Sequence, residues 1–140
     1  MHLDRDAALQ RAAAADHGVL ATRNATGSAD LVPACFAIID GWLAVPIDSI
    51  KPKRSTALGR VRNLERDPRA TFLVEHWDAA DWARLWWVRL SLRRADAGAD
   101  VAARLEHALR ERYAQYATTV FADLVTFQIE AVGGWEAAGA

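Results

Sequence analysis

Apolar residues recur along the chain with two different spacings, and each spacing predicts its own kind of element. Short runs rich in β-branched and aromatic residues are typical of strands, whereas apolar residues three and four positions apart indicate an amphipathic helix. Strand-like runs occupy residues 18–23, 29–39, 42–47, 69–77, 85–94 and 123–132. Helix-like spacing occupies residues 4–15, the segment that follows Ser55 and the segment that begins at Asp100. The pattern therefore predicts six strands and three helices.

The residues between these segments carry signals for turns and helix ends. Asp40-Gly41 lies between two apolar runs, which is the strongest short-range signal for a β-hairpin. Asp67-Pro68 ends the second helix, because the residue before a proline disfavours the helical conformation. Since the strands are mostly sequential and joined by short turns, we expect an antiparallel sheet. Closing this sheet into a small barrel would remove its exposed edges, so the expected fold class is α+β, mainly β with helices.

Length, charge and cysteine content restrict the class of protein. A chain of 140 residues with 52% hydrophobic residues is expected to form a single domain over residues 1–140. No stretch approaches twenty apolar residues, and the charged N-terminal segment lacks the layout of a secretory signal, so we expect no membrane contact. The single cysteine, Cys35, suits a reducing cytoplasm. A net charge of −1 argues against a general nucleic-acid-binding protein.

Several common chemistries lack their motifs in this chain. Neither glycine-rich phosphate loop is present, and there is no G-x-S-x-G motif. The four histidines have no metal-ligand spacing with one another or with Cys35, so we expect no metal site. No residue is singled out as catalytic. Tyr113 and Tyr116 are weak candidates for a proton donor, and a role in the core or at an interface fits both of them better.

The stretch SIKPKRSTALGRVRNL (residues 49–64) has five cations and no acid, and it contains both lysines of the chain. Lys51 and Lys53 precede a helix whose first residues include Arg54 and Ser55. Cations in a loop, a hydroxyl and the free N–H groups of a helix start together make an anion site. A solvated basic face is the alternative interpretation. We favour the anion site, because the cations precede the helix and Pro52 stiffens the loop.

The six tryptophans are the second unusual feature, and four of them fall between residues 77 and 87. Adjacent Trp86 and Trp87 in one strand must point to opposite faces of the sheet. One indole can therefore enter the core, while the other faces outward toward a partner subunit or a stacked ring. Burial of both within one chain is the alternative. A homodimer is favoured, because a chain of this length has little material to cover both faces.

These motifs together resemble the split β-barrel oxidoreductases that use flavin or deazaflavin, a family that includes proteins similar to pyridoxamine 5'-phosphate oxidase. The resemblance covers roughly residues 17–94, and the closing strand near residues 123–135 agrees in type. It is closer to the actinobacterial branch of coenzyme F-420-dependent enzymes, which the alanine-rich and arginine-rich composition also favours. The motifs that carry it are V-P (32–33), D-G (40–41), K-P-K-R (51–54), R-N-L (62–64), D-P-R (67–69) and W-W-V-R (86–89).

The resemblance implies a six-stranded antiparallel split barrel, similar to FMN-binding barrels, that forms a homodimer with cofactor sites at the subunit interface. The cofactor would be F-420, or alternatively FMN, with its phosphate on Lys51, Lys53, Arg54 and Ser55. Trp87, or Trp86, would close the site from the interface. The residues that would flank the cofactor ring are Pro33, Ala34, Phe36, Val45, Pro46 and Ile47.

The resemblance implies an F-420-dependent oxidoreductase that transfers a hydride to or from a small unsaturated organic substrate. An FMN-dependent enzyme on the same fold, similar to pyridoxamine 5'-phosphate oxidase, is one alternative. The substrate-phosphate residues of those oxidases have no counterpart in the C-terminal segment, so oxidation of vitamin B6 is not expected. A non-catalytic protein that binds deazaflavin or flavin is the second alternative. A small nucleic-acid-binding barrel is the third, and the net charge of −1 makes it the least favoured.

Overall fold

The fold is that of a computed structural model, which describes residues 1–48, 56–118 and 121–137; of residues 47, 48, 56–58 and 122 only the backbone is described. The helices are α1 (Arg5–Ala14), α2 (Thr56–Arg66) and α3 (Ala99–Arg112), with short 3-10 turns η1 (Trp82–Arg84) and η2 (Ala114–Tyr116). The strands are β1 (Gly18–Arg23), β2 (Ala29–Ala34), β3 (Ala37–Ile39), β4 (Trp42–Asp48), β5 (Arg69–His76), β6 (Trp86–Arg94) and β7 (Phe121–Glu136).

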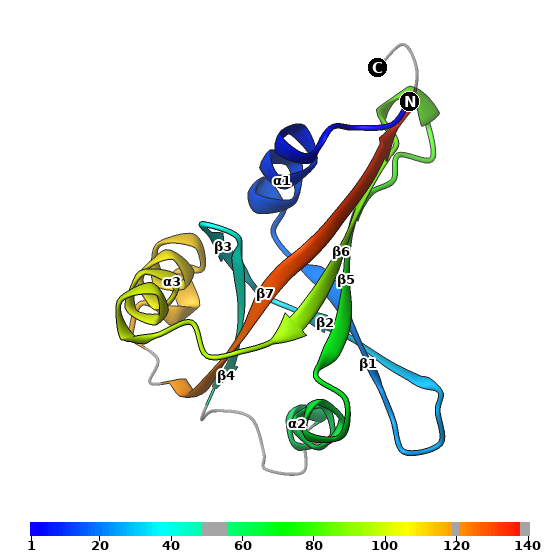
Figure 1. Cartoon of the computed structure of the whole chain (residues 1–140). Helices are drawn as coiled ribbons and strands as arrows, with labels where there is room; N and C mark the ends of the chain where they lie inside the picture. The colour runs from blue at the N-terminus through cyan, green and yellow to red at the C-terminus, as the bar shows by residue number, and fades with distance from the viewer. Residues whose placement is uncertain (49–55, 119–120, 138–140) are drawn as a thin grey trace.

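Seven strands form one antiparallel sheet in the order β2-β1-β5-β6-β7-β4-β3. The two strands at the edges, β2 and β3, are consecutive in the sequence and are separated only by Cys35 and Phe36. Because both edges of the sheet belong to one short segment of chain, the sheet must curl to bring them together (Figure 1). The predicted α+β class and antiparallel sheet are confirmed.

The predicted strand over residues 29–39 is interrupted, and this is why seven strands appear where six were expected. At the interruption the ring of Phe36 is fully buried and packs on Phe72 with ring centroids 4.8 Å apart. The hydroxyl of Tyr113 lies 3.2 Å from both the backbone nitrogen and the backbone oxygen of Phe36. A side chain from the end of α3 thus satisfies backbone groups that a continuous strand would pair with a neighbour.

The core fills the inside of the curled sheet. Its largest side chains without exposed surface include Phe36, Phe72 and Phe127. Alternate residues of β6 point inward, so Trp86 packs against this core while Trp87 lies on the outer face, as the sequence predicted. A smaller apolar cluster lies beneath α3, where Leu105 and Leu109 are fully buried.

The helices begin and end where local signals place them. The side chain of Asp4 accepts a hydrogen bond from the Ala7 nitrogen at 2.8 Å and caps α1. α2 ends at Arg66, immediately before Asp67-Pro68. The turn between β3 and β4 has positive φ at Asp40 (50°) and Gly41 (80°), the conformation of the predicted hairpin. Among the described residues, every helix is too short or too polar to cross a membrane.

The last strand is longer than predicted, because β7 continues through Gly133 and Gly134. A Cβ atom at Gly134 would lie 3.1 Å from the Cβ atom of Ala8 in α1. The absence of a side chain at this position lets α1 pack directly on the sheet while the ladder with β6 continues to Glu136. Gly134 therefore serves helix packing rather than a turn, whereas a Cβ atom at Gly133 would meet nothing within 4 Å.

Candidate functional site

A groove of about 290 Å³ lies between the start of α2 and the edge strand β2. One wall consists of Gly59 and Arg60 in the first half of α2. The other wall belongs to the β1–β2 hairpin and includes the carboxylate of Asp30 and the side chain of Leu31, which is 67% exposed. The groove thus offers a cation, an acid and an exposed apolar surface close together. Its full lining is Thr22, Ala29, Asp30, Leu31, Val32, Gly59 and Arg60.

A polar cluster beneath the groove joins its two walls. The side-chain nitrogen of Asn63, on α2, donates to Thr22 Oγ1 on β1 at 3.0 Å and to Asp30 Oδ2 on β2 at 2.9 Å. The amide oxygen of Asn63 accepts from Arg66 at 3.0 Å. Asn63 and Thr22 are 3% and 2% exposed, so the hydrogen bond between them is shielded from water, whereas the bonds to Asp30 and from Arg66 are partly buried. Buried and fully paired, the amide of Asn63 fixes the helix against the hairpin.

Asp30 is held in its ionised form by the same cluster. Its second carboxylate oxygen, Oδ1, accepts from the side chain of Asn24 at 3.0 Å. Hydrogen bonds from Asn24 and Asn63, with a smaller contribution from the charge of Arg66, lower the pKa of Asp30 below its usual value. The groove therefore contains a carboxylate at neutral pH, fixed in place by two amide donors, and Arg60 contributes to the other wall.

The four residues predicted to bind a phosphate, Lys51, Lys53, Arg54 and Ser55, lie outside the described residues. Their place in the chain is nevertheless informative. They follow β4, which ends at Asp48, and they precede α2, which begins at Thr56. The phosphate-binding assignment stays a prediction.

The predicted ring-flanking residues lie on two strands that are far apart in the sheet order. Pro33 and Ala34 are on β2, the strand that carries the groove residues Asp30 and Leu31. Pro33 is exposed and Ala34 is buried. We therefore expect Pro33 to be the more accessible of the two to a ligand.

The remaining predicted ring-flanking residues have less access to a ligand. Val45 and Pro46 lie on β4, pair with β7 and are buried, and the Ile47 side chain lies outside the description. Phe36 is wholly inside the core and has its backbone bonded to Tyr113. Because their side chains are buried, Phe36, Val45 and Pro46 can underlie a ligand site but cannot form the exposed surface that a ligand contacts. Their role in binding stays a prediction.

Trp87 lies at the opposite end of the sheet from the segment that links β4 to α2. Asp48, at the end of β4, pairs with Phe121 at the start of β7, whereas Trp87 pairs with Trp135 near the end of β7. The strand from Phe121 to Trp135 spans roughly 45 Å at about 3.3 Å per residue. Figure 1 shows this separation, with α2 at the lower end of the sheet and both chain termini at the upper end. Within one chain, Trp87 is therefore far from Asp48, the last described residue before the predicted phosphate loop.

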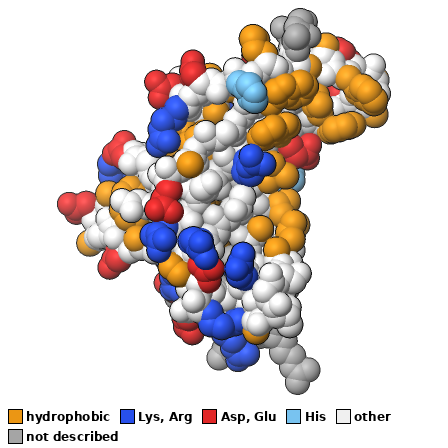
Figure 2. Space-filling view, turned by 45° about the vertical axis from the view of Figure 1, so that its right-hand side comes forward, with side chains coloured by type: hydrophobic (Ala, Val, Ile, Leu, Met, Phe, Trp, Pro, Cys, Tyr) orange, Lys and Arg blue, Asp and Glu red, His pale blue; other side chains and the backbone are white. Residues whose placement is uncertain are grey.

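The outer face around Trp87 combines aromatic and charged side chains. Trp87 pairs with Trp135 on β7 and with Glu75 on β5, and the Arg89 guanidinium lies 5.3 Å from the centroid of the Trp87 ring. Leu73, on β5, is 39% exposed on the same face. Figure 2 shows hydrophobic side chains gathered toward the upper end of this view and several Arg side chains toward the lower end.

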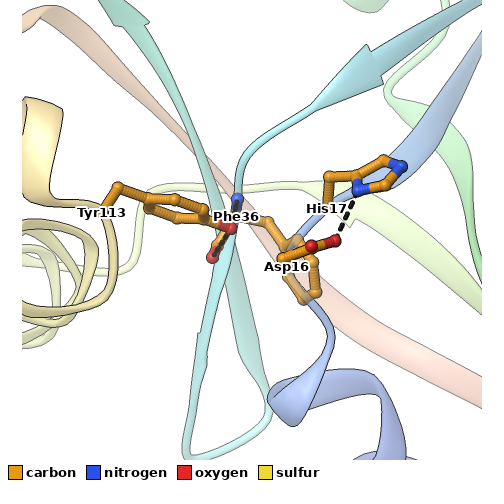
Figure 3. Close-up of polar contacts among 4 residues, drawn as sticks. All are labelled: Asp16, His17, Phe36 and Tyr113. Atoms are coloured by element: carbon orange, nitrogen blue, oxygen red, sulfur yellow. Dashed lines mark hydrogen bonds and ion pairs between the residues drawn. The ribbon is translucent and has the colours of Figure 1, made fainter.

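Tyr113 is bound in a way that argues against a role as proton donor. Its hydroxyl is engaged with the backbone of Phe36, and burial raises its pKa above the usual value. On the other side of Phe36, His17 Nδ1 lies 2.6 Å from Asp16 Oδ1, and both side chains are exposed (Figure 3). The contacts drawn there form two separate pairs, so Tyr113 fastens α3 to the strand interruption instead of belonging to a shared acid–base group.

Sequence reasoning missed the residues that make the groove. Asp30 and Leu31 fall in a strand-like run, and Asn63 falls in a helical one, so none stood out. The R-N-L and D-P-R motifs contained the one available signal, because a polar asparagine beside the apolar Leu64 on a helix suggests a buried polar contact. The partners Thr22 and Asp30 could not be read from the sequence, since 41 and 33 residues separate them from Asn63.

Comparison with known proteins identifies solved structures that share this fold. No family model and no curated protein matches the sequence. Among solved structures, a heme-binding protein of Mycobacterium smegmatis superimposes with a TM-score of 0.72 at 20% identity, covering 95% of this chain and 54% of its own. An FAD-binding protein of the same organism has a TM-score of 0.63 at 14% identity, covering 96% of both chains.

A third solved structure, a candidate pyridoxamine 5'-phosphate oxidase of Corynebacterium glutamicum, has a TM-score of 0.59 at 14% identity and covers 96% of this chain and 94% of its own. This chain spans about half the length of the heme-binding protein. Sequence identity of 20% or less establishes shared architecture but not shared ligands. The chain therefore has the split-barrel fold of these flavin-binding and heme-binding proteins, with three helices around a curled antiparallel sheet.

Proposed function

We propose that this protein is an F-420-dependent oxidoreductase that transfers a hydride to or from a small unsaturated organic molecule. The observation that carries the proposal is the groove between α2 and β2, which adjoins the helix that follows the K-P-K-R loop. Support also comes from the fold, which an FAD-binding protein and a candidate flavin enzyme share. Bound F-420 would supply the two-electron chemistry, and the protein would bind, orient and shield it.

The groove suits one part of such a cofactor. Ligand pockets commonly enclose about 300–1,000 Å³, so a groove of about 290 Å³ is at the small end of that range. The apolar surface of Leu31 and Val32 can contact a ring or its edge, and Asp30 can accept hydrogen bonds from the hydroxyls of a sugar-alcohol chain. Arg60 on the opposite wall would balance an acidic group. The rest of a large cofactor needs further surface.

A second copy of this chain would provide that surface. Trp87 lies at the opposite end of the sheet from Asp48, which precedes the K-P-K-R loop in the chain, so we expect that one chain cannot place both Trp87 and that loop on one ligand. In a two-fold dimer packed through the outer face of β5, β6 and β7, the Trp87 end of one subunit can lie against the α2 end of the other. Leu73, Trp87 and Trp135 provide apolar surface for such a contact, and Glu75 and Arg89 on the same face could form ion pairs across it. The proposed enzyme is accordingly a homodimer.

FMN in place of F-420 is the second candidate, because an FAD-binding protein shares this fold over nearly the whole chain. Both cofactors carry a phosphate and a tricyclic ring, so the same groove and loop would serve either. A protein that binds the cofactor without turning over a substrate is also consistent with the fold, since one structural relative is a heme-binding protein. The experiments below separate these possibilities.

The first test is a fluorescence titration of the protein with F-420 and, separately, with FMN. We expect dissociation constants in the micromolar range or tighter for F-420 and much weaker binding of FMN. The double variant Lys51→Ala/Lys53→Ala should weaken F-420 binding at least about tenfold, the loss expected when two cations no longer face a phosphate. The matched control is Arg5→Ala/Arg104→Ala, which removes the same charge from exposed residues of α1 and α3. Binding of neither cofactor would refute the proposal.

Turnover distinguishes an enzyme from a binding protein. Reduced F-420 is mixed with small acceptors that contain an activated carbon–carbon double bond, a nitro group or a quinone, and its reoxidation is followed by absorbance. The acceptor gains the hydride and a proton from water, while the reduced cofactor becomes oxidised. Tight binding without turnover of any acceptor would assign the protein to cofactor binding alone.

A further inference from the structure

We propose that Asn63 is a positioning residue that sets the width of the cofactor groove by linking its two walls. This inference rests on the proposed function, because it assigns Asn63 a role in binding the cofactor that the groove would hold. Asn63 does not line the groove and touches no ligand. It acts through Asp30 and Thr22, which do line it.

The two walls of the groove come from segments that are distant in sequence. Gly59 and Arg60 move with α2, whereas Thr22, Asp30 and Leu31 move with the β1–β2 hairpin. Between these walls, Asn63 provides two hydrogen bonds from one amide group, at 3.0 Å to Thr22 and 2.9 Å to Asp30. Asn63 is therefore a buried side chain that links the two walls through two residues that line the groove.

Apolar packing alone would not fix the walls as precisely. Leu64, next to Asn63, is 3% exposed and already buries part of α2 against the core. Apolar contact is non-directional and tolerates sliding or rotation of a helix. The hydrogen bonds of Asn63 have strict requirements for distance and angle, so they permit one register of α2 against the hairpin. Losing them would leave the Asp30 carboxylate with one fewer donor and free the helix to shift.

The link extends to the tip of the hairpin. Asn24 donates to Asp30, and its own side-chain oxygen accepts from the backbone nitrogens of Thr26 and Ser28 at 3.1 Å each. The turn, the carboxylate in the groove and α2 are thus parts of one hydrogen-bonded series. Because every carboxylate oxygen of Asp30 has an amide donor, its position in the groove depends on Asn63 and Asn24 together.

The test compares Asn63→Leu, which keeps the size of the side chain but removes its donors, with Leu109→Ala. Leu109 is fully buried in the separate cluster beneath α3, and its loss should lower stability at least as much without touching the groove. Free energies of unfolding from urea titration and dissociation constants for F-420 and FMN are measured for each protein. We expect Asn63→Leu to weaken binding of the preferred cofactor about tenfold or more and Leu109→Ala to leave it within about twofold.

A second pair of variants tests whether cofactor binding depends on the hydroxyl group of Thr22. Thr22→Val removes the hydroxyl that accepts from Asn63, while Thr22→Ser keeps it. We expect weaker cofactor binding for the valine variant and nearly wild-type binding for the serine variant. Unchanged affinity in Asn63→Leu, or equal losses in Asn63→Leu and Leu109→Ala, would overturn the positioning role while leaving the proposed function intact. If the wild-type protein binds neither cofactor, the proposed function fails, and this inference fails with it.

Discussion

The two ends of the sheet differ in the kind of side chain that they present. At the end that carries α2, polar groups dominate, and Asn24, Asp30 and Asn63 form a connected series of hydrogen bonds. At the opposite end, aromatic rings dominate: Trp77 and Trp82 are 60% and 68% exposed and lie edge to face with centroids 6.1 Å apart. The hydrogen bonds of Asn24, Asp30 and Asn63 at the polar end are made within the chain, whereas the aromatic end leaves two indoles in contact with water.

This difference shows how one small chain could build a site that it cannot enclose alone. A satisfied polar network suits the fixed wall of a binding groove, because its geometry does not depend on a partner. Exposed indoles suit a surface that another molecule covers. Since the two ends are separated by the length of β7, the proposed dimer is the arrangement that brings them together. The following predictions test this division, from the largest expected effect to the smallest.

Trp87→Glu should have the largest effect, because it places a charge in the centre of the proposed contact face. Central interface residues commonly contribute 2 kcal/mol or more, so we expect the dimer to dissociate at least about thirtyfold more readily. Sedimentation equilibrium measures the change. Ala103→Glu, on an exposed position of α3, is the control and should sediment as the wild-type protein does. A Trp87→Glu variant with wild-type dimer affinity would show that the contact face lies elsewhere.

Asn24→Ala should destabilise the polar end. Its side-chain oxygen accepts hydrogen bonds from the backbone of Thr26 and Ser28, and its nitrogen donates to Asp30. We expect a loss of about 1–2 kcal/mol in the free energy of unfolding, measured by urea titration. Thr26→Ala, which removes only the 2.7 Å hydroxyl contact, should cost less. If Asn24→Ala were as stable as the wild-type protein, water would be replacing the hydrogen bonds of Asn24 with no loss in the free energy of unfolding.

Low pH should reduce the stability of the fold at the polar end, because it protonates Asp67, which immediately follows α2. Two side-chain hydrogen bonds of 3.0 Å from Arg69, together with its backbone nitrogen, lower the pKa of Asp67 from 3.8 to about 2. A lowered pKa stabilises the fold above about pH 4, and this contribution is lost as the pH falls toward 2. Asp67→Asn should therefore be less stable than the wild-type protein at pH 5, with a difference that shrinks toward pH 2. A constant difference across this range would contradict the assignment.

Trp82→Ala should have the smallest effect. Its side chain is 68% exposed and contacts mainly Trp77, so we expect a change of less than about 0.5 kcal/mol in the free energy of unfolding. Denaturation at low and high protein concentration measures it. A loss above about 1 kcal/mol that grows with protein concentration would show that a second subunit covers the exposed indoles and that the contact face extends to η1.

Much of the local structure was determined by the sequence itself. The Asp4 cap, the proline after Asp67 and the Asp40-Gly41 turn each act within a few residues, so the ends of α1, α2 and the β3–β4 hairpin follow from neighbours in the chain. The opposite orientations of Trp86 and Trp87 follow from the two-residue period of a strand. The basic stretch and its position before a helix are also properties of sequence alone.

Only the tertiary structure decided where these segments meet. The interruption at Phe36 depends on Tyr113, 77 residues away, and the groove depends on Asn63 reaching Asp30, 33 residues away. The passage of β7 through Gly134 depends on α1, which packs against it. Local rules restrict a backbone over a few residues, whereas these contacts depend on the register of strands and helices that approach only after the sheet has curled. For that reason the sequence determined most of the elements and the cationic stretch, and the tertiary structure decided the groove and the separation of Trp87 from Asp48 at the end of β4.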